Sequence, residues 1–290
     1  MVVVRIVGGL GNQMFQYACG RAISRRSNSN LLLDVSVFSR YKQHRYGLGE
    51  FMLEAKQAPW YLTSGGNIWA ALRKIGINNK QCLRLGGFSI LNEHEDLSFR
   101  PDSLGIFTKV YLDGYWQNES YFKEEAALIR ADFQLRSQLR LHSASSTLMS
   151  DGLANVSLHV RRGDYVTNSQ ANATHGVLGA GYYADAVKLI EKGLGKDFRL
   201  VVFSDDAVWA RENLKFSQPM HFVAGNTEAP HIDLHLMAMC DHHIIANSSF
   251  SWWGAWLNAS NNKIVIAPKN WFRTQRYATA DFCPAKWLRV

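Results

Sequence analysis

The chain opens with VVVRIVGGLGNQMFQYACGRAISRR, residues 2–26, which contains three local patterns in succession. Residues 2–7 are mostly β-branched and apolar, which favours a strand, and the glycine-rich residues 8–13 favour a turn. Residues 14–26 place apolar side chains at helical spacing: Phe15, Ala18, Ala22 and Ile23. A second apolar strand at 31–34 follows, so the start of the chain predicts a βαβ unit.

The rest of the chain continues this alternation. In the first half we expect a strand at 109–112 and a helix at 119–133, whereas residues 40–102 lack a sustained period and predict loops and short helices. The second half predicts strands at 156–160, 198–203, 220–223, 243–246 and 263–267, with helices near 182–193, 206–214, 231–240 and 251–258. Such alternation is typical of parallel sheets covered by helices, which bind ligands at the carboxyl ends of the strands.

A polar, serine-rich segment, LRLHSASSTLMSDGLAN, separates the two halves. Domain boundaries favour segments of this composition, because few packed contacts cross them. We therefore expect an N-terminal domain at 1–150 and a C-terminal domain at 151–290, with a cleft between them.

Composition narrows the kind of partner. The chain has 290 residues, 47% of them hydrophobic, which is enough for one large or two ordinary domains with cores and excludes disorder. Its net charge of +8 favours an anionic partner. Because the basic residues are spread along the chain, we expect a local anion site rather than a basic tail. The cysteines form no CxxC pair and predict neither a zinc knuckle nor a disulfide framework: Cys19, Cys82, Cys240 and Cys283.

The hydropathy pattern bears on localisation. The apolar run at the N-terminus is too short for a signal peptide, and no later run approaches the ~18 apolar residues of a membrane span. The expectation is a cytoplasmic protein.

Three of the expected strands in the second half end in polar loops. The motifs are LHVRRGDY at 158–165, FSDD at 203–206 and NSSF at 247–250. Serine hydroxyls and backbone N–H groups at a helix N-terminus suit a phosphate, an Asp after a strand suits a ribose hydroxyl or a base, and arginine offers a bidentate clamp for a diphosphate. Each motif alone also has a purely structural explanation, since Ser249 can be a helix cap and Asp205 a helix start.

Several motifs together resemble the bacterial α-1,2-fucosyltransferases of glycosyltransferase family eleven. They are GGLGNQMFQYA at 8–18, HVRRGDY at 159–165, FSDD at 203–206 and CDHHIIANSSFSWWGAWLN at 240–258, followed by APKNWF and CPAKW. The resemblance spans nearly the whole chain and is least clear at about 40–105.

This resemblance implies an α/β fold of GT-B type, with two Rossmann-like domains facing a cleft. It implies inverting transfer of L-fucose to the 2-hydroxyl of a terminal β-galactoside, without a metal or a cofactor. GDP-β-L-fucose would be the donor substrate, bound by the C-terminal domain. A galactose-terminated glycan would be the acceptor, on the side of the N-terminal domain, and peripheral membrane contact with a lipid-linked acceptor is compatible with this.

The resemblance also implies donor-binding roles for residues at matching motif positions. Arg161 would hold the β-phosphate, and His159 and Asp205 would contact the guanosine. Ser248 and Ser249 would hold phosphate oxygens. These residues coincide with the polar loops at the expected strand ends.

The remaining assignments concern a contact from the N-terminal domain with the donor substrate, and the proton transfer. Asn12, in the GLGNQ loop, would reach the phosphate and fucose from the N-terminal domain. Arg161 would stabilise the charge on the leaving GDP, and Asp164 is our candidate general base, although it could equally orient the arginine pair. Asp34 is a weaker alternative base. Side chains alternate across a strand, so we expect Arg162 to point away from Arg161 and to be held by a carboxylate or backbone carbonyls.

Three rival interpretations remain. A metal hydrolase is suggested by the histidines and the aspartate at 231, 233, 235, 242 and 243, but no third ligand has recognisable spacing. A nucleic-acid-binding module is suggested by the pI near 9.3 and the nine tryptophans, although those at 252, 253 and 256 are expected to be buried. Within the enzyme class, HxRRxD also occurs in α-1,6-fucosyltransferases.

Overall fold

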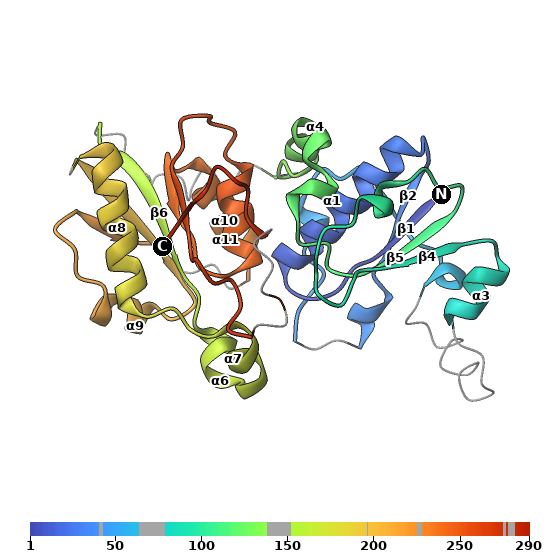
Figure 1. The fold of residues 1–290 in the computed structure, drawn as a ribbon, viewed down its shortest axis with the longest axis horizontal. Helices are drawn as coiled ribbons and strands as arrows, with labels where there is room; N and C mark the ends of the chain where they lie inside the picture. Colours follow the sequence, from blue (N-terminus) through green and yellow to red (C-terminus); the bar gives the residue numbers. More distant parts are fainter. Residues whose placement is uncertain are drawn as a thin grey trace. The chain divides into compact units, whose positions relative to one another are not determined.

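The protein is described by a computed structural model. It describes residues 1–40, 43–63, 79–137, 152–195, 197–224, 228–274, 277 and 282–290. The chain divides into two compact units, Met1–Arg136 and Ser137–Val290, here called unit 1 and unit 2 (Figure 1). The boundary that the sequence predicts, between residues 150 and 151, lies outside the described residues.

Unit 1 contains a five-stranded sheet in the order β3-β2-β1-β5-β4, with every neighbouring pair parallel. The central strand is apolar at successive positions because both of its faces are covered, and Val2, Val3 and Val4 are fully buried. The expected βαβ unit is confirmed. The strand bounds are β1 Val2–Arg5, β2 Leu31–Asp34, β3 Lys56–Gln57, β4 Ser89–Asn92 and β5 Val110–Asp113.

Helix α1 (Leu10–Arg26) packs against β1 and β2 and begins earlier than the sequence pattern predicts. The glycine loop is short because Gly8 adopts a φ of +84°, which turns the chain from strand to helix within a few residues. A side chain at Gly20 would be crowded, since a Cβ there would lie 3.0 Å from Leu31 Cδ1 and 3.1 Å from Val4 Cγ1. The glycine therefore lets the helix lie close to the sheet.

Two expectations for unit 1 were wrong in detail. Residues 40–102 were expected to hold only loops and short helices, yet they contain β3 and β4 besides helix α3 (Asn79–Leu85). β4 is an edge strand with half-exposed and exposed side chains, so it shows no apolar period. The helix expected at 119–133 is limited to α4 (Ala126–Asp132), because two 3₁₀ turns occupy its first part and the Asn118 side chain caps the first turn by accepting the N–H of Ser120.

Unit 2 contains a six-stranded parallel sheet in the order β11-β10-β9-β6-β7-β8. The five strands that the sequence predicts are confirmed, and the short edge strand β11 was not predicted. The bounds are β6 Ala154–Val160, β7 Phe198–Ser204, β8 Met220–Phe222, β9 His242–Ile244, β10 Val265–Ala267 and β11 Leu288–Arg289.

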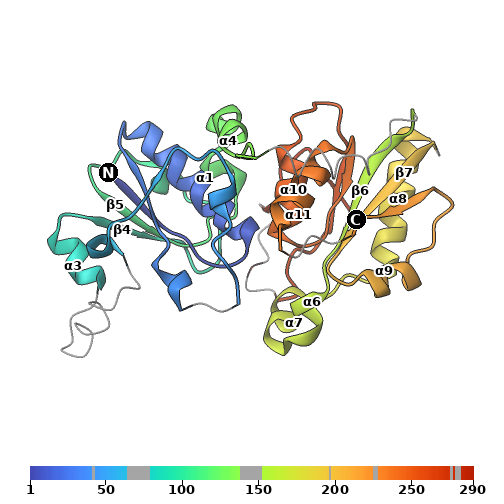
Figure 2. The ribbon, with the colours of Figure 1, turned by 180° about the vertical axis from the view of Figure 1, so that it is seen from behind.

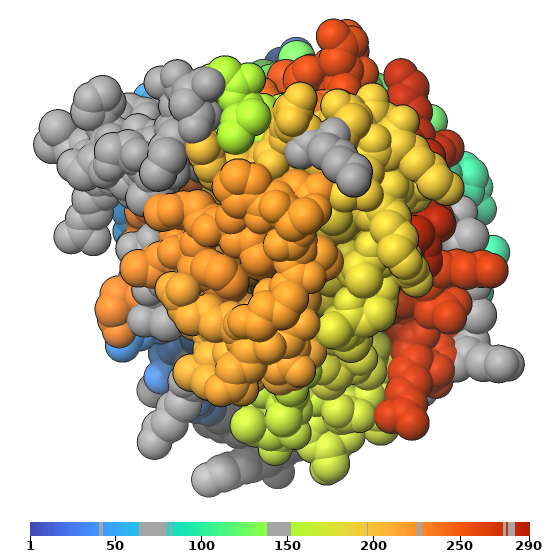
Figure 3. Space-filling view, turned by 90° about the vertical axis from the view of Figure 1, so that its left-hand side faces the viewer, coloured from blue at the N-terminus to red at the C-terminus, as the bar shows by residue number. Residues whose placement is uncertain are grey.

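Helices cover both faces of this sheet. In Figures 1 and 2, α8 and α9 lie on one side of it and α10 and α11 on the other. Figure 3 shows one face of unit 2, where α8, in yellow, and the orange segment after β7 lie side by side. Among the helices of the described segments, none is both long and apolar enough to cross a membrane. The bounds are α6 Gly163–Thr167, α7 Ser169–His175, α8 Ala180–Leu194, α9 Ala207–Asn213, α10 Pro230–Met239 and α11 Ser249–Leu257.

The tryptophans of α11 lie in the interior of unit 2. Trp252 and Trp253 are fully buried and Trp256 is 2% exposed. The Trp252 indole N–H donates to the carbonyl of Phe282 at 2.7 Å, which satisfies its polar atom inside the core. The expected burial of these three rings is therefore confirmed, and they are unable to stack on nucleic-acid bases.

Candidate functional site

The carboxyl ends of β6 and β7 bring three charged side chains together. Val160 pairs with Ser204 in the sheet, so the residues that follow, Arg161 and Asp205, start side by side. Arg161 Nη1 donates to Asp205 Oδ2 at 2.6 Å, and Nη2 donates to Asp164 Oδ1 at 2.6 Å. The guanidinium bridges two carboxylates while 29% of the arginine side chain stays exposed.

The neighbouring arginine has different partners, as strand alternation predicts. Arg162 Nε donates to Asp206 Oδ2 at 3.0 Å, and its guanidinium lies 4.2 Å from the centre of the Trp209 ring. These contacts fix Arg162 to the start of α9. The two arginines therefore differ in role, since Arg162 holds the loop and Arg161 faces the carboxylate pair.

Gly163 is required by close packing at this site. A Cβ at this position would lie 2.6 Å from Asp205 Oδ2, well inside van der Waals contact. Asp205 also accepts the backbone N–H of Arg162 at 2.8 Å through its other carboxylate oxygen. The RRGD sequence thus lets the Asp205 carboxylate sit directly against the backbone of the loop.

His159 lies near the end of β6, shortly before Arg161, and is 6% exposed. Burial lowers the pKa of His159 to about 4, with Asp205 raising it and Arg161 lowering it. The ring is therefore neutral at pH 7, and its Nδ1 is buried without a hydrogen-bond partner within the described parts of the chain. The imidazole centre lies 5.7 Å from the Phe250 ring centre. A neutral His with a free nitrogen is able to hydrogen-bond a polar ligand.

The NSSF motif begins helix α11. Ser248 is the N-cap residue, and its Oγ accepts the backbone N–H of Phe250 at 3.3 Å. Ser248 is 7% exposed, and Ser249, the first helical residue, is half-buried. Capping explains Ser248 structurally, while the helix N-terminus also provides a favourable site for an anion.

Tyr165, His175 and Asn247 connect these loops, and the sequence alone did not assign them a role. The Tyr165 hydroxyl donates to the Asn247 carbonyl at 3.2 Å, and its ring stacks on His175 at 4.7 Å with an interplanar angle of 1°. The Asn247 side chain donates to the carbonyl of His175 at 2.8 Å. Tyr165 and Asn247 stand inside the quoted motifs, whereas no pattern marks His175.

Two candidate residues lie in unit 1. Asn12 Oδ1 accepts a hydrogen bond from Gln117 Nε2 at 2.6 Å. The contact of Asn12 with the donor substrate remains a prediction. Asp34 is 1% exposed, and its carboxylate accepts the hydroxyls of Tyr111 and Ser36 at 2.6 Å each. Its buried and fully engaged carboxylate argues against Asp34 as a base for an acceptor hydroxyl.

The histidines behind the metal interpretation are dispersed or engaged with other groups. His235 Nδ1 lies 2.9 Å from the carbonyl of His231, one turn earlier in α10. His243 is fully buried and bonded to Ser157 Oγ at 2.8 Å, and burial lowers its pKa to about 3. Within the described residues, no group of three or more His, Cys, Asp or Glu side chains is arranged to hold a metal ion.

Comparison with known sequences points to one family. The profile of Glycosyl transferase family 11 matches residues 86–290. The chain is 35% identical to an Escherichia coli alpha-1,2-colitosyltransferase, with 100% of this chain and 99% of the relative covered. It is 34% identical to the E. coli O-antigen biosynthesis glycosyltransferase WbnK, covering 91% and 93%. The mouse galactoside 2-alpha-L-fucosyltransferase Sec1 is 27% identical, with coverage of 100% and 74%.

Solved structures support the fold. The α-1,6-fucosyltransferase NodZ soaked with GDP-fucose superposes with a TM-score of 0.53 at 16% identity, covering 88% of this chain and 91% of that one. An Arabidopsis thaliana FUT1 mutant in complex with GDP gives a TM-score of 0.56 at 11% identity, covering 98% and 75%. The α/β fold of GT-B type, with two Rossmann-like units, is therefore confirmed. Since the family profile covers residues 86–290 and two bacterial relatives exceed 30% identity over at least 91% of the chain, this protein belongs to glycosyltransferase family 11.

Proposed function

We propose that this protein transfers L-fucose from GDP-β-L-fucose to the 2-hydroxyl of a terminal β-galactoside, with inversion, to form an α-1,2 linkage. The observation that carries the proposal is the Arg161 guanidinium, held at the end of β6 by two carboxylates. An arginine fork matches the oxygens of a diphosphate, and unit 2 also offers the α11 N-terminus. The galactoside fucosyltransferases among the relatives support the acceptor class.

When the donor substrate binds, Arg161 would exchange at least one of its present partners for the donor. Its guanidinium edges are occupied by Asp164 and Asp205, so a β-phosphate oxygen would replace at least one carboxylate. Asp205, released in this way, and the neutral His159 would hydrogen-bond the guanosine. Ser248 and Ser249 would bind phosphate oxygens, and Asn12 would approach the phosphate and fucose from the N-terminal domain.

The transfer itself needs charge stabilisation and proton removal. The acceptor oxygen attacks the anomeric carbon from the face opposite GDP, the bond from this carbon to the phosphate oxygen breaks, and Arg161 stabilises the charge on the leaving diphosphate. Asp164 takes the proton of the attacking hydroxyl. We assign donor binding to the C-terminal domain, the acceptor side to the N-terminal domain, and the protein to the cytoplasm, with peripheral contact where the acceptor is lipid-linked.

We also infer that the reaction requires no divalent metal. The acidic pair Asp205-Asp206 could hold a cation, but each carboxylate is paired with an arginine, at 2.6 Å and 3.0 Å. Full activity is expected in EDTA. Loss of turnover in EDTA with recovery on Mn²⁺ would show that a metal takes part.

One assay tests the proposal and its closest rivals. The purified protein is incubated with GDP-fucose and a panel of β-galactosides, and the linkage and anomeric configuration of the product are determined by NMR. GDP-colitose is tested in parallel, because the 35% identical relative is named a colitosyltransferase. An α-1,2-fucosylated galactoside supports the proposal. Transfer of colitose alone would show that the donor is GDP-colitose and not GDP-fucose. An α-1,6 product would contradict the proposed α-1,2 linkage.

A further inference from the structure

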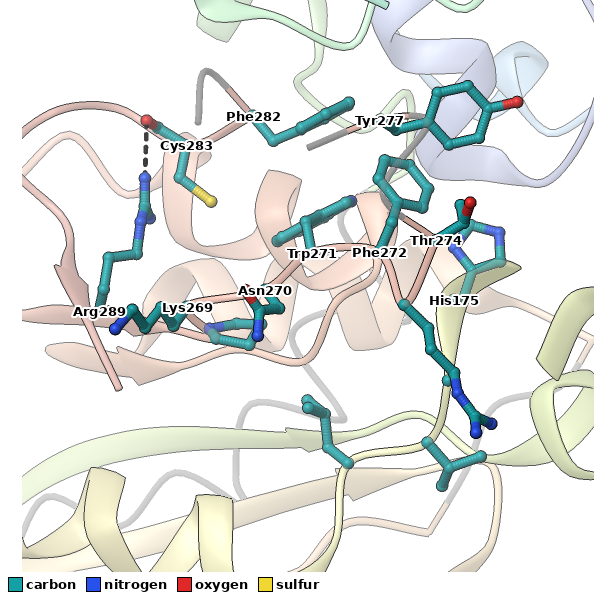
Figure 4. A pocket seen from close by; sticks show the side chains of 15 residues that line it. His175, Lys269, Asn270, Trp271, Phe272, Thr274, Tyr277, Phe282, Cys283 and Arg289 are labelled. Carbon is teal, nitrogen blue, oxygen red and sulfur yellow. Dashed lines mark hydrogen bonds between the residues drawn. The ribbon is translucent and has the colours of Figure 1, made fainter. Parts of the chain in front are cut away.

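Unit 2 contains a cavity of about 760 Å³ that the donor site described above does not use (Figure 4). Residues 268–274, which follow β10, form one part of its wall, and residues 175–178 form another. Cys283 and Arg289, near the C-terminal edge of the sheet, complete the described lining with Phe282 and Tyr277. Its volume lies in the range of sites for small molecules, about 300–1,000 Å³.

The charge of the described part of the lining is one-sided. Lys269, Arg273 and Arg289 line the cavity, and none of the described lining residues is an Asp or a Glu. Arg289 Nη2 donates to the carbonyl of Cys283 at 3.1 Å, but its Nη1 is buried without a hydrogen-bond partner within the described residues. The positive charges of Lys269 and Arg289 make this end of the cavity suited to an oxyanion.

The middle of the cavity is aromatic. Trp271 and Phe282 stack with ring centres 6.1 Å apart, and Phe272 meets Phe282 edge-on at 5.0 Å. Figure 4 shows Trp271 between Arg289 with Lys269 on one side and Phe272 on the other. The ring faces provide apolar area beside the cationic end, which suits a ligand that joins an apolar face to a negative charge.

A row of side chains links the other end of the cavity to Arg161. The Arg161 guanidinium lies 5.4 Å from the Tyr165 ring centre, Tyr165 stacks on His175 at 4.7 Å, and His175 lies 5.1 Å from Phe272. His175 lines the cavity, and its Nδ1 is buried and unpartnered within the described residues. The stacked rings of Tyr165 and His175 therefore connect this end of the cavity to the group proposed to hold the donor phosphate.

We propose that the cavity is a subsite for an acidic part of the acceptor glycan. This rests on the proposed function. A sugar near the reacting galactose occupies the aromatic middle, and a negatively charged group on it, a carboxylate or a phosphate, pairs with Arg289 and Lys269. Unit 2 then contributes to acceptor choice, in addition to the N-terminal domain.

Matched acceptors and variants test this subsite. One pair is a disaccharide of β-galactose and glucuronic acid and its uncharged methyl ester. A second pair is a β-galactosyl N-acetylglucosamine with and without a 1-phosphate, which distinguishes phosphate from carboxylate. The variants are Lys269→Gln and Arg289→Gln, and the control is Lys188→Gln, an exposed cation of α8 that lies outside the cavity lining. Hydrolysis of GDP-fucose without acceptor reports the donor site separately.

The wild type is expected to have a KM about tenfold lower for one acidic acceptor than for its neutral partner, and each cavity variant to lose that preference. In the cavity variants, the KM for the neutral acceptor and the rate of donor hydrolysis should stay unchanged. The control variant should keep the preference of the wild type. If Arg289→Gln fails to fold, Lys269→Gln alone tests the subsite. The Lys269 side chain is exposed, so its replacement should leave the fold intact. Equal KM values for acidic and neutral acceptors in the wild type, or equal losses for both in the variants, overturn the subsite. Absence of donor hydrolysis and of all transfer would instead overturn the proposed function.

Discussion

Replacing Arg161 with lysine tests the central element of the proposed site. Arginine presents two nitrogens to Asp164 and Asp205 at 2.6 Å each, whereas an ammonium group is a point charge without the planar fork. The Arg161→Lys variant would keep the charge and lose the bidentate geometry that a diphosphate needs.

The expected effect falls on the transition state rather than on the fold. Removing a preorganised partner of the developing charge costs about 2–4 kcal/mol, which corresponds to a decrease in kcat/KM of roughly 30- to 1,000-fold. The free energy of unfolding should change little. The Arg161 side chain is 29% exposed, and partly exposed ion pairs contribute only about 0–1 kcal/mol because solvent screens them.

Arg162→Lys is the matched control, because it makes the same chemical change one residue away. It removes the Nε contact with Asp206 and the packing of the guanidinium on Trp209. We expect about 1–2 kcal/mol lower stability, seen as a Tm lower by several degrees, together with reduced activity.

Steady-state kinetics with GDP-fucose, binding of GDP by calorimetry and thermal unfolding are measured for both variants. Arg161→Lys should lower kcat/KM with an unchanged Tm, and Arg162→Lys should lower both. Wild-type turnover in Arg161→Lys, or a GDP complex with Arg162 on the β-phosphate, would refute the assignment.

Three further outcomes are expected. Gly163→Ala places a Cβ 2.6 Å from Asp205 Oδ2, so the carboxylate must shift; GDP affinity should fall about tenfold by calorimetry, and unchanged affinity would mean that Asp205 does not contact the nucleotide. Asp164→Asn should lower kcat by roughly two to four orders of magnitude while GDP affinity changes little, and a parallel fall in affinity would indicate that it only orients the arginine. His159 and His243 have pKa values lowered to about 4 and about 3, so the stability they contribute is present above pH 6.5 and is lost as the pH falls toward those values. Each should lower the free energy of unfolding by on the order of 1 kcal/mol at pH 5.5, measured as a lower urea midpoint than at pH 7.5, and equal midpoints would contradict neutral burial.

Much of the fold could be predicted from local pattern. The central strand β1 is buried on both faces and shows as a continuous apolar run. The last five residues of β6 are all buried as well, although its apolar residues alternate with Asn155, Ser157 and His159. The edge strands β3, β4 and β11 were missed, because an exposed or half-exposed strand of two to four residues has no period that distinguishes it from a loop. The helix at 119–133 was overextended, because the Asn118 cap acts through a local hydrogen bond that periodicity does not register.

Part of the candidate site was also predictable, for a general reason. Parallel strands bring their carboxyl ends to one edge, so Arg161 and Asp205 could be placed together from their positions after β6 and β7. Their detailed pairing was not predictable. The sequence suggested that Asp205 contacts guanosine, and it did not indicate that Asp205 also binds Arg161 and packs against Gly163.

The sequence by itself determined the α/β alternation, the family resemblance and the residues that stand at the strand ends, because these depend on local periodicity and on motifs contiguous in the chain. Only the tertiary structure decided which side chains from distant segments meet. It stacked His175 on Tyr165 and set it beside Phe272, and it closed the cavity with Arg289 from the last strand. The physical reason is that such contacts depend on how helices and loops pack against the sheet, and no spacing along the chain encodes the distance between residues 175 and 289.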